Sequence, residues 1–227
     1  SLFWQAQYPS LSNYMNSQTN ITPKMRGILI NWLIEVRYVI FVSVVTIQTN
    51  EIQLVGLTAL LLASKYEDFW HPKVNELIAI TDDSYTRLQM LSMEKLILKK
   101  LMFRLNTPTP YVFMLRFLKA AQSDKKLEHL AFYLIELCLT EYEALKFRSS
   151  LLCASAIYVA RCTLQMSPAW TPLLCKHAHY EEDCAEMILR FHKASSKGPL
   201  KVTYGKYVCE SYLCVAKIKA VHRLLPQ

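Results

Sequence analysis

Residues 51–105, EIQLVGLTALLLASKYEDFWHPKVNELIAITDDSYTRLQMLSMEKLILKKLMFRL, decide the fold class of this chain. The part from Ile52 to Tyr66 is apolar on nearly every face of a helix, and Gly56, Ala59 and Ala63 keep that helix slim. A helix that is hydrophobic all round belongs in the centre of a bundle, where small residues let neighbouring helices approach closely. The stretch therefore predicts an all-α protein built around this segment.

A single charge interrupts this apolar pattern at its C-terminal end. Lys65 follows Leu54, Thr58 and Leu61 at the i, i+3, i+4 spacing that places side chains on one stripe of a helix. The lysine is therefore expected where the buried stripe reaches the surface.

A second helix is expected after Thr81-Asp82-Asp83-Ser84, residues that supply N-cap candidates and negative charge at the positive end of the helix dipole. Leu91, Leu98 and Leu101 are predicted to share one face of it, and Glu94 falls among them. A carboxylate in an apolar stripe is costly to bury unless a partner satisfies it.

Lys65 and Glu94 are therefore the first candidates for function. In one interpretation they pair with each other inside the domain. In the other, they together hold the backbone of a helix or loop of a partner protein.

The composition bounds the class of protein. The chain has 227 residues, 52% of them hydrophobic and only 4 of them glycine, which favours a well-packed globular protein. No apolar run is long enough to span a membrane without a charge or a breaker. Residues 1–20 lack the pattern of a secretory signal. Because the chain starts at Ser1, we expect a fragment whose targeting and degradation signals lie upstream.

The seven cysteines all lie in the second half, and their odd number without CxxC pairs indicates reduced intracellular thiols. They are Cys138, Cys153, Cys162, Cys175, Cys184, Cys209 and Cys214. The one metal-like group is Cys175, His177, His179 and Cys184, but its spacing fits no structural zinc module. We expect neither a metal nor another cofactor.

The formal net charge of +8 is compatible with nucleic acid or with an acidic protein surface as partner. Lysines and arginines are scattered and no basic run alternates with aromatic residues, so nucleic acid is the weaker interpretation. There is no Gly-rich phosphate loop, GxSxG or HExxH motif. We therefore expect a protein that is not an enzyme.

The chain is predicted to contain two similar helical bundles in tandem, because the slim apolar pattern recurs at 150–163 and Pro108 and Pro110 break the chain between them. The expected organisation is a lead-in at 1–22, a first bundle at 23–106, a second at 107–196 and a loosely attached basic tail at 197–227. Further helices are expected at 111–121, 127–142 and 179–194, a helix start at Thr22-Pro23, and a short element from Trp170-Thr171-Pro172. Residues 37–50, RYVIFVSVVTIQTN, are β-branched without helical period, and their conformation is left open.

Four motifs in order carry a resemblance to a known family. They are MRGILINWLIEV (25–36), LLASKYED (61–68), TDDSYT with MEKLILKKLMFRL (81–86 and 93–105), and TPTPYVFMLRFLKAA (107–121). Together they closely resemble the mitotic A/B-type cyclins, most of all the plant B-type group and its third subclass, from about Tyr14 into the tail.

The resemblance implies two tandem five-helix cyclin folds and a regulatory subunit that binds and activates a cyclin-dependent kinase in G2/M control. It implies that Lys65 and Glu94 hold the C-helix of the kinase and a neighbouring loop, the same two residues that the charge pattern selects. The apolar rim of that interface corresponds to Tyr66, Leu98, Phe103 and Leu105.

The family also docks Arg-x-Leu segments of substrates or inhibitors in a groove. The matching positions are Met25, Ile28, Leu29, Trp32, Glu35 and Gln53, and ordinary core packing is the alternative for the apolar ones. The resemblance implies the nucleus as location, with the cytoplasm as a second one. A transcription-associated cyclin fold that contacts nucleic acid is the alternative from another class, and salt-dependent DNA binding would favour it.

The sequence departs from the family between Val36 and Glu51. A helix of about 11–12 residues with two loops of roughly 4 needs about 20 residues, and residues 37–50 cannot supply them. We hypothesise a splice variant, a mispredicted gene product or a degenerate paralogue whose first box lacks its second helix. Arg26 then loses its acidic partner, apolar surface is exposed around Leu57 and Leu61, and kinase binding is impaired or lost.

Overall fold

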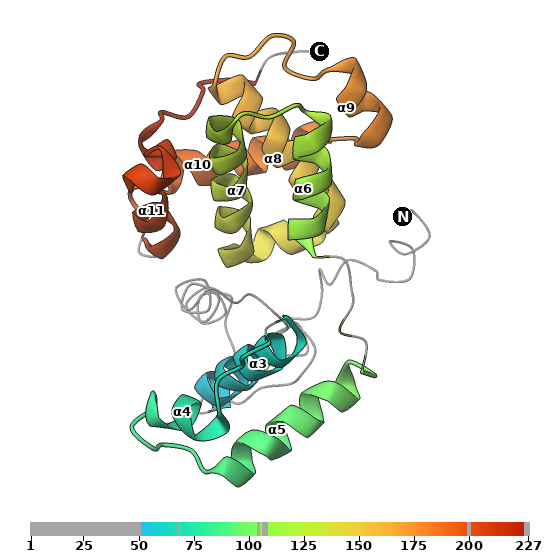
Figure 1. Cartoon of the computed structure of the whole chain (residues 1–227). Coiled ribbons are helices and arrows are strands. Elements are labelled where there is room, and N and C mark those ends of the chain that lie inside the picture. The colour runs from blue at the N-terminus through green and yellow to red at the C-terminus, as the bar shows by residue number, and fades with distance from the viewer. Residues whose placement is uncertain (1–50, 68, 104, 106–108, 199–200, 225–227) are drawn as a thin grey trace. The chain divides into compact units, whose positions relative to one another are not determined.

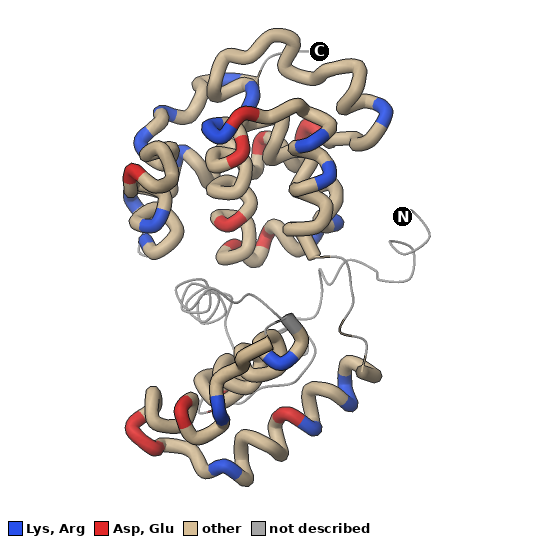
Figure 2. Tube along the Cα trace, in the orientation of Figure 1, with Lys and Arg blue, Asp and Glu red and all other residues tan. Residues whose placement is uncertain are grey.

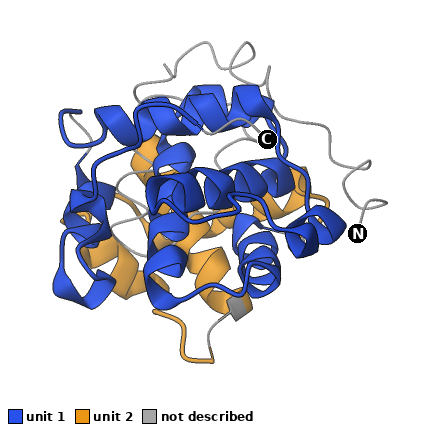
Figure 3. Cartoon of the chain, turned by 90° about the horizontal axis from the view of Figure 1, so that it is seen from above, with its two compact units in different colours: residues 1–12, 108–227 blue, residues 13–107 orange. Residues whose placement is uncertain are grey.

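The computed structural model describes residues 51–224, apart from 68, 104, 106–108 and 199–200, and leaves the side chain of Glu67 undescribed. Every regular element in this part of the chain is a helix, which agrees with the predicted all-α class. The described residues fall into two compact units, one before residue 108 and one from 108 onward (Figure 3). We call them the N-terminal and the C-terminal unit and describe each by itself.

The N-terminal unit is built on α3 (Ile52–Glu67), which packs mainly against α5 (Arg87–Lys100), with the short α4 (Val74–Ala79) between them in sequence (Figure 1). Every residue of α3 from 54 to 64 is buried. The all-round apolar pattern therefore marks a core helix, as predicted, and Thr58 satisfies its buried hydroxyl by donating to the Leu54 carbonyl at 2.7 Å.

The start of α5 differs from the sequence-based expectation. Its N-cap is Thr86, whose hydroxyl accepts a hydrogen bond from the Gln89 N–H while the Gln89 side chain accepts from the Thr86 N–H. This reciprocal capping box satisfies two helix-end donors at once. The expected cap at Thr81–Ser84 is wrong: that segment forms a turn, and Asp82 and Asp83 adopt positive φ, which ends any helical path there.

The buried face of α5 is also shifted from the prediction. Met90, Met93 and Ile97 are its buried residues, whereas Leu91, Leu98 and Leu101 are only half-buried. Methionine side chains are flexible and fill irregular gaps in a core, so they can be the buried residues of a helix pair even where leucines are present. The leucines instead border the core on the side that carries Glu94.

The C-terminal unit surrounds a second buried helix, α8 (Ser149–Thr163), with α6 (Pro110–Ala120), α7 (Lys125–Thr140) and α10 (Glu182–Ala194) (Figure 1). All residues from 152 to 163 are buried, as predicted for a slim apolar helix. The buried Arg161 within it donates to the carbonyls of Pro168 and Ala169 at 2.8 and 2.9 Å, which compensates its loss of water.

The starts of these helices follow from local sequence. Pro110 opens α6, and the Asp124 carboxylate accepts from the Leu127 N–H at the start of α7. Thr171 caps α9 (Pro172–His177) in the same way. Three expected helices thus lie within a few residues of their predicted ranges, although α10 begins at Glu182 rather than at residue 179.

The tail is folded onto the C-terminal unit, so the expectation of a loosely attached segment at 197–227 is wrong for its described residues. It contains α11 (Val202–Tyr207) and two short 3-10 helices, η4 (Glu210–Tyr212) and η5 (Val215–Lys217), and a third, η3 (Tyr142–Lys146), lies earlier in the unit. Tyr207 and Val215 belong to the hydrophobic core. These apolar residues attach the tail to the core. The many lysines around them make the tail look polar in sequence, which is why the sequence predicts a loosely attached segment.

The expected exposure of apolar surface on α3 is also wrong. Leu57 and Leu61 are 1% and 0% exposed. Burying a leucine side chain contributes roughly 1.5–3 kcal/mol to folding, so the burial of both side chains stabilises the folded chain. The expectations for the lead-in, the helix from Thr22, Arg26 and the missing second helix fall outside the described residues.

Candidate functional site

Lys65 lies in the last turn of α3, one residue beyond the buried run that ends at Ser64. A cation at this end of a helix is favoured by the helix dipole. Its side chain is 37% exposed. The lysine therefore stands where the core helix reaches the surface, as its spacing from Leu61 predicts.

Glu94 lies in the middle of α5, beside the buried Met93, and its side chain is only 12% exposed. The Lys65 Nζ donates a hydrogen bond of 2.6 Å to Glu94 Oε1, so the pair joins α3 to α5. The first interpretation of the sequence, internal pairing, is confirmed as geometry. The partner-binding interpretation remains a prediction.

The pair leaves hydrogen-bonding capacity unused. An ammonium group has three N–H donors and a carboxylate has two acceptor oxygens. Among the described residues, Lys65 uses one donor and Glu94 uses one oxygen. A charged donor and a charged acceptor therefore remain side by side, a combination suited to a carbonyl and an N–H of another backbone.

Exposed apolar side chains adjoin the pair in the sequence. Tyr66, next to Lys65, is 53% exposed, and Phe103, just beyond α5, is 69% exposed. Leu98 follows Glu94 by one helical turn and is half-buried, as is Leu105. Large apolar side chains held in water are typical of surfaces that bind another protein.

The end of α5 holds Phe103 in its exposed position. Met102 and Phe103 have φ values of 50° and 56°, and the Phe103 N–H donates to the Leu98 carbonyl at 2.9 Å. Residues other than glycine lose roughly 1–2 kcal/mol in this left-handed region. The helix end is thus fixed by hydrogen bonds at some conformational cost.

Sequence reasoning missed two further exposed rings in the loop between α3 and α4. Phe69 and Trp70 are both largely exposed, and they contact each other edge to face with ring centroids 5.2 Å apart. The signal was available, because two aromatic residues precede Pro72 in a segment with no helical period. They extend the list of apolar candidates in the N-terminal unit.

The predicted docking groove cannot be assembled from the described residues. Met25, Ile28, Leu29, Trp32 and Glu35 lie outside them, and Gln53 is exposed in the first turn of α3. The groove therefore remains a prediction.

The cysteine and histidine group does not converge on a metal. Cys175 is exposed on α9, whereas Cys184 is buried in α10. Within the described residues no cluster of His, Cys, Asp or Glu is arranged to hold a metal ion. None of the helices described is long and apolar enough to cross a membrane.

Comparison with family descriptions covers most of the chain. Residues 108–221 match "Cyclin, C-terminal domain", and residues 4–40 and 38–106 match "Cyclin, N-terminal domain". A viral cyclin from herpesvirus saimiri, solved by X-ray methods, superposes with a TM-score of 0.67 at 18% identity, covering 83% of this chain and 91% of that one. That likeness supports the fold. The fold class is thus a pair of cyclin domains.

Relatives found by sequence show which type of cyclin this chain resembles. "Putative cyclin-B3-1" of Arabidopsis thaliana is 57% identical over 98% of this chain and 62% of its own length. "Cyclin-B2-2" of Oryza sativa subsp. indica is 45% identical, with 90% and 54% covered. "G2/mitotic-specific cyclin S13-7" of Glycine max is 41% identical, with 86% and 84% covered. The chain belongs to the cyclin family, among relatives of the plant B type, and spans about half to two thirds of the first two relatives.

The alignments also include positions that have no counterpart in this chain. The Arabidopsis alignment runs over 244 positions but includes 98% of the 227 residues of this chain, about 222, so about 22 positions have no counterpart here. The Oryza alignment, 225 positions against 90% of the chain, leaves about 21. The two segments that match the N-terminal domain meet at residues 38–40. That junction falls inside 37–50, the segment in which the second helix is predicted from the sequence to be missing.

Proposed function

We propose that this chain is a regulatory, non-catalytic subunit that binds and activates a cyclin-dependent kinase in G2/M cell-cycle control. The observation that carries the proposal is the Lys65–Glu94 ion pair, which is partly exposed and has donors and an acceptor that no described residue uses. Membership of the cyclin family supports assigning this pair to a kinase. The exposed Tyr66 and Phe103, with Leu98 and Leu105, supply apolar contact area on the segments that carry the pair.

The proposed mechanism is allosteric. Lys65 and Glu94 bind backbone groups of the kinase C-helix and its neighbouring loop, and the apolar rim excludes water from these hydrogen bonds. The C-helix then turns inward, which forms the Lys–Glu pair of the kinase and reshapes its activation loop. All chemistry remains in the kinase, which fits the role of a subunit that only regulates.

We further propose that Arg-x-Leu segments of substrates or inhibitors dock at Met25, Ile28, Leu29, Trp32, Glu35 and Gln53, with Glu35 facing the arginine. The proposed location is the nucleus, with the cytoplasm as a second one. Both proposals rest on family resemblance.

The test is capture of a mitotic cyclin-dependent kinase by the full chain, followed by phosphorylation of histone by the captured complex. We expect Lys65→Ala/Glu94→Ala to lose binding and activity together. Lys125→Ala/Glu128→Ala is the matched control, because it removes another lysine–glutamate pair, at 3.0 Å and exposed at the start of α7, and should change neither. Equal behaviour of the two double variants would refute the assignment of the site.

A second candidate function is a cyclin-like protein with impaired kinase binding. The deficit of about 22 aligned positions, together with an N-terminal-domain match that is divided at residues 38–40, favours it specifically. A variant in which the corresponding segment of the Arabidopsis relative is inserted between residues 38 and 40 separates the two. If only the insertion variant binds kinase, the parent chain has the interface residues but has lost the ability to bind a kinase. If both bind, the first candidate function holds.

A further inference from the structure

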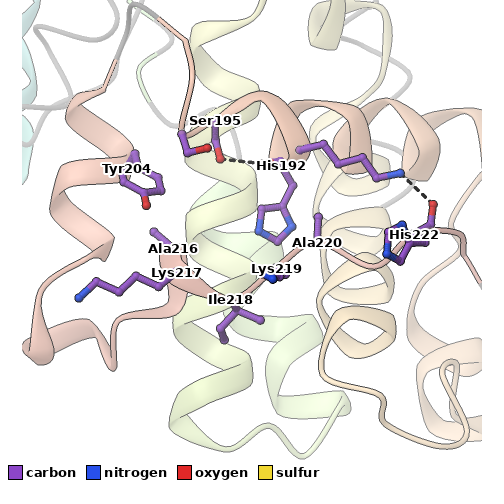
Figure 4. Close-up of a pocket in the computed structure, with 11 residues that line it drawn as sticks. His192, Ser195, Tyr204, Ala216, Lys217, Ile218, Lys219, Ala220 and His222 are labelled. Atoms are coloured by element: carbon purple, nitrogen blue, oxygen red, sulfur yellow. Dashed lines mark hydrogen bonds between the residues drawn. The ribbon is translucent and has the colours of Figure 1, made fainter.

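The C-terminal unit contains a basic pocket between the end of α10, α11 and the segment that follows η5 (Figure 4). Its volume is about 350 Å³. Lys193, Lys217 and Lys219 line it, together with the hydroxyl-bearing Ser196 and Tyr204. None of the described residues that line it is an aspartate or a glutamate.

Several of these donors are free to meet a ligand. Lys193 uses one of its three N–H groups, donating to the His222 carbonyl at 2.8 Å (Figure 4). Lys217 and Lys219 are exposed and form no ion pair with any described residue. Lysines that line a concave site and have no described carboxylate partner favour an anionic ligand.

His192 forms part of the pocket wall and is 4% exposed. Neither ring nitrogen has a hydrogen bond of acceptable geometry to a described residue, although the ring approaches the backbone of Ile218. Burial lowers the pKa of His192 to about 4, so the ring is neutral near pH 7 and adds one N–H donor to the pocket wall.

The chain segment around the pocket is also positively charged. From Lys193 to Leu224 the sequence has seven lysines and arginines and a single acidic residue, Glu210. Figure 2 shows basic residues recurring along this part of the C-terminal unit. Such a surface attracts anions from a distance before any specific contact forms.

We propose that this pocket binds a phosphoryl group carried on a serine or threonine side chain of a partner peptide. A phosphate ester has close to two negative charges and three strong acceptor oxygens, which suits a pocket lined by three lysines and two hydroxyl groups better than the two oxygens of a carboxylate do. The pocket opens to the surface and has room for one modified side chain. The proposal concerns the C-terminal unit and does not depend on kinase binding.

The test measures binding of the full chain to a fluorescent phosphothreonine peptide and to the same peptide without phosphate. We expect the phosphorylated peptide to bind at least about tenfold more tightly, with the difference shrinking as salt rises. Lys217→Ala/Lys219→Ala should weaken that binding by about fivefold or more. Lys126→Ala/Lys176→Ala removes the same charge from exposed positions of the same unit and should weaken it less than about twofold.

Two further arms complete the test. Inorganic phosphate should compete only at concentrations far above those of the peptide, and nuclear magnetic resonance of the histidines should show the pKa of His192 rising when the phosphopeptide binds. Equal binding of the two peptides, or equal losses in the two double variants, would overturn the proposal. So would displacement by inorganic phosphate at peptide-like concentrations, which would assign the pocket to the free ion. Thermal melting verifies that each variant is folded.

Discussion

Lys206 Nζ lies 2.7 Å from Glu136 Oε1, an ion pair that joins the tail to α7 across 70 positions of the chain. The hydroxyl of Tyr207 donates to the same oxygen at 2.8 Å. Because the carboxylate receives two donors from α11, a single side chain fixes the direction in which the tail returns to the core.

Replacing that carboxylate should destabilise the C-terminal unit. Glu136→Leu leaves the Tyr207 hydroxyl and the half-buried Lys206 without their acceptor, and we expect a loss of about 1–3 kcal/mol of unfolding free energy. Urea unfolding measures it. Glu128→Leu on the same helix breaks only an exposed pair and should cost less than about 0.5 kcal/mol. Comparable losses in the two variants would contradict this role for Glu136.

His192 should make stability depend on pH. Burial lowers its pKa from 6.5 to about 4. Between these values the unfolded chain binds a proton that the folded chain excludes, so stability is complete above pH 6.5 and declines as the pH falls toward 4, by roughly 3 kcal/mol in total. The groups facing the ring are Tyr133, with centroids 5.7 Å apart, and the lysines and His222 of the pocket.

The measurement is the urea midpoint of the parent chain and of His192→Gln from pH 7 to pH 4. The variant should lose much of the slope, while His222→Gln, at an exposed position, should retain it. Parallel curves for parent and His192→Gln would show that another group controls the acid transition.

Phe103 should contribute to partner binding and little to stability, because most of its ring is in water. We expect Phe103→Ala to weaken capture of a cyclin-dependent kinase by about tenfold or more, as truncation of an aromatic anchor does in other interfaces. The melting temperature should move by less than about 2 °C. Leu115→Ala, an exposed leucine on α6 of the other unit, is the control for loss of surface apolar area. A large drop in melting temperature would assign Phe103 to the fold instead.

Five of the seven thiols should fall into two classes of reactivity. Cys175 and Cys209 are exposed and should react with a thiol reagent at once. Burial raises the pKa of Cys138 and Cys153 and brings that of Cys184 to about 11, so these thiols lack both access and thiolate character. Counting modified cysteines before and after denaturation checks this, and rapid native labelling of Cys138 would contradict it.

Patterns repeated within one helix were predictable from sequence. The slim apolar runs identify α3 and α8 as core helices, because no arrangement of a helix apolar on all sides leaves it in water at low cost. The start of α9 follows from Thr171-Pro172 for a local reason of the same kind. Lys65 and Glu94 were selected because charges within apolar stripes require an explanation.

Choices between nearly equivalent residues could not be predicted. Thr86 rather than Thr81 caps α5, and Met90 rather than Leu91 faces the core, because the packing of α5 against α3 decides the rotation of the helix. The difference in hydrophobicity between such residues is too small to predict which of them is buried. Two aromatic residues before Pro72 signalled the Phe69–Trp70 pair, but its exposure depends on what the rest of the chain leaves uncovered.

The sequence by itself determined the all-helical class, the two core helices, the family and the two charges of the candidate site, because each rests on spacing within a segment or on motifs in order. Tertiary structure alone decided that Lys65 and Glu94 pair at 2.6 Å, that the basic tail returns to Glu136, and that His192 is buried beside a lysine-lined pocket. These contacts join residues 29 and 70 positions apart, or gather several elements around one space. Their free energies depend on burial and distance, which no local pattern of residues encodes.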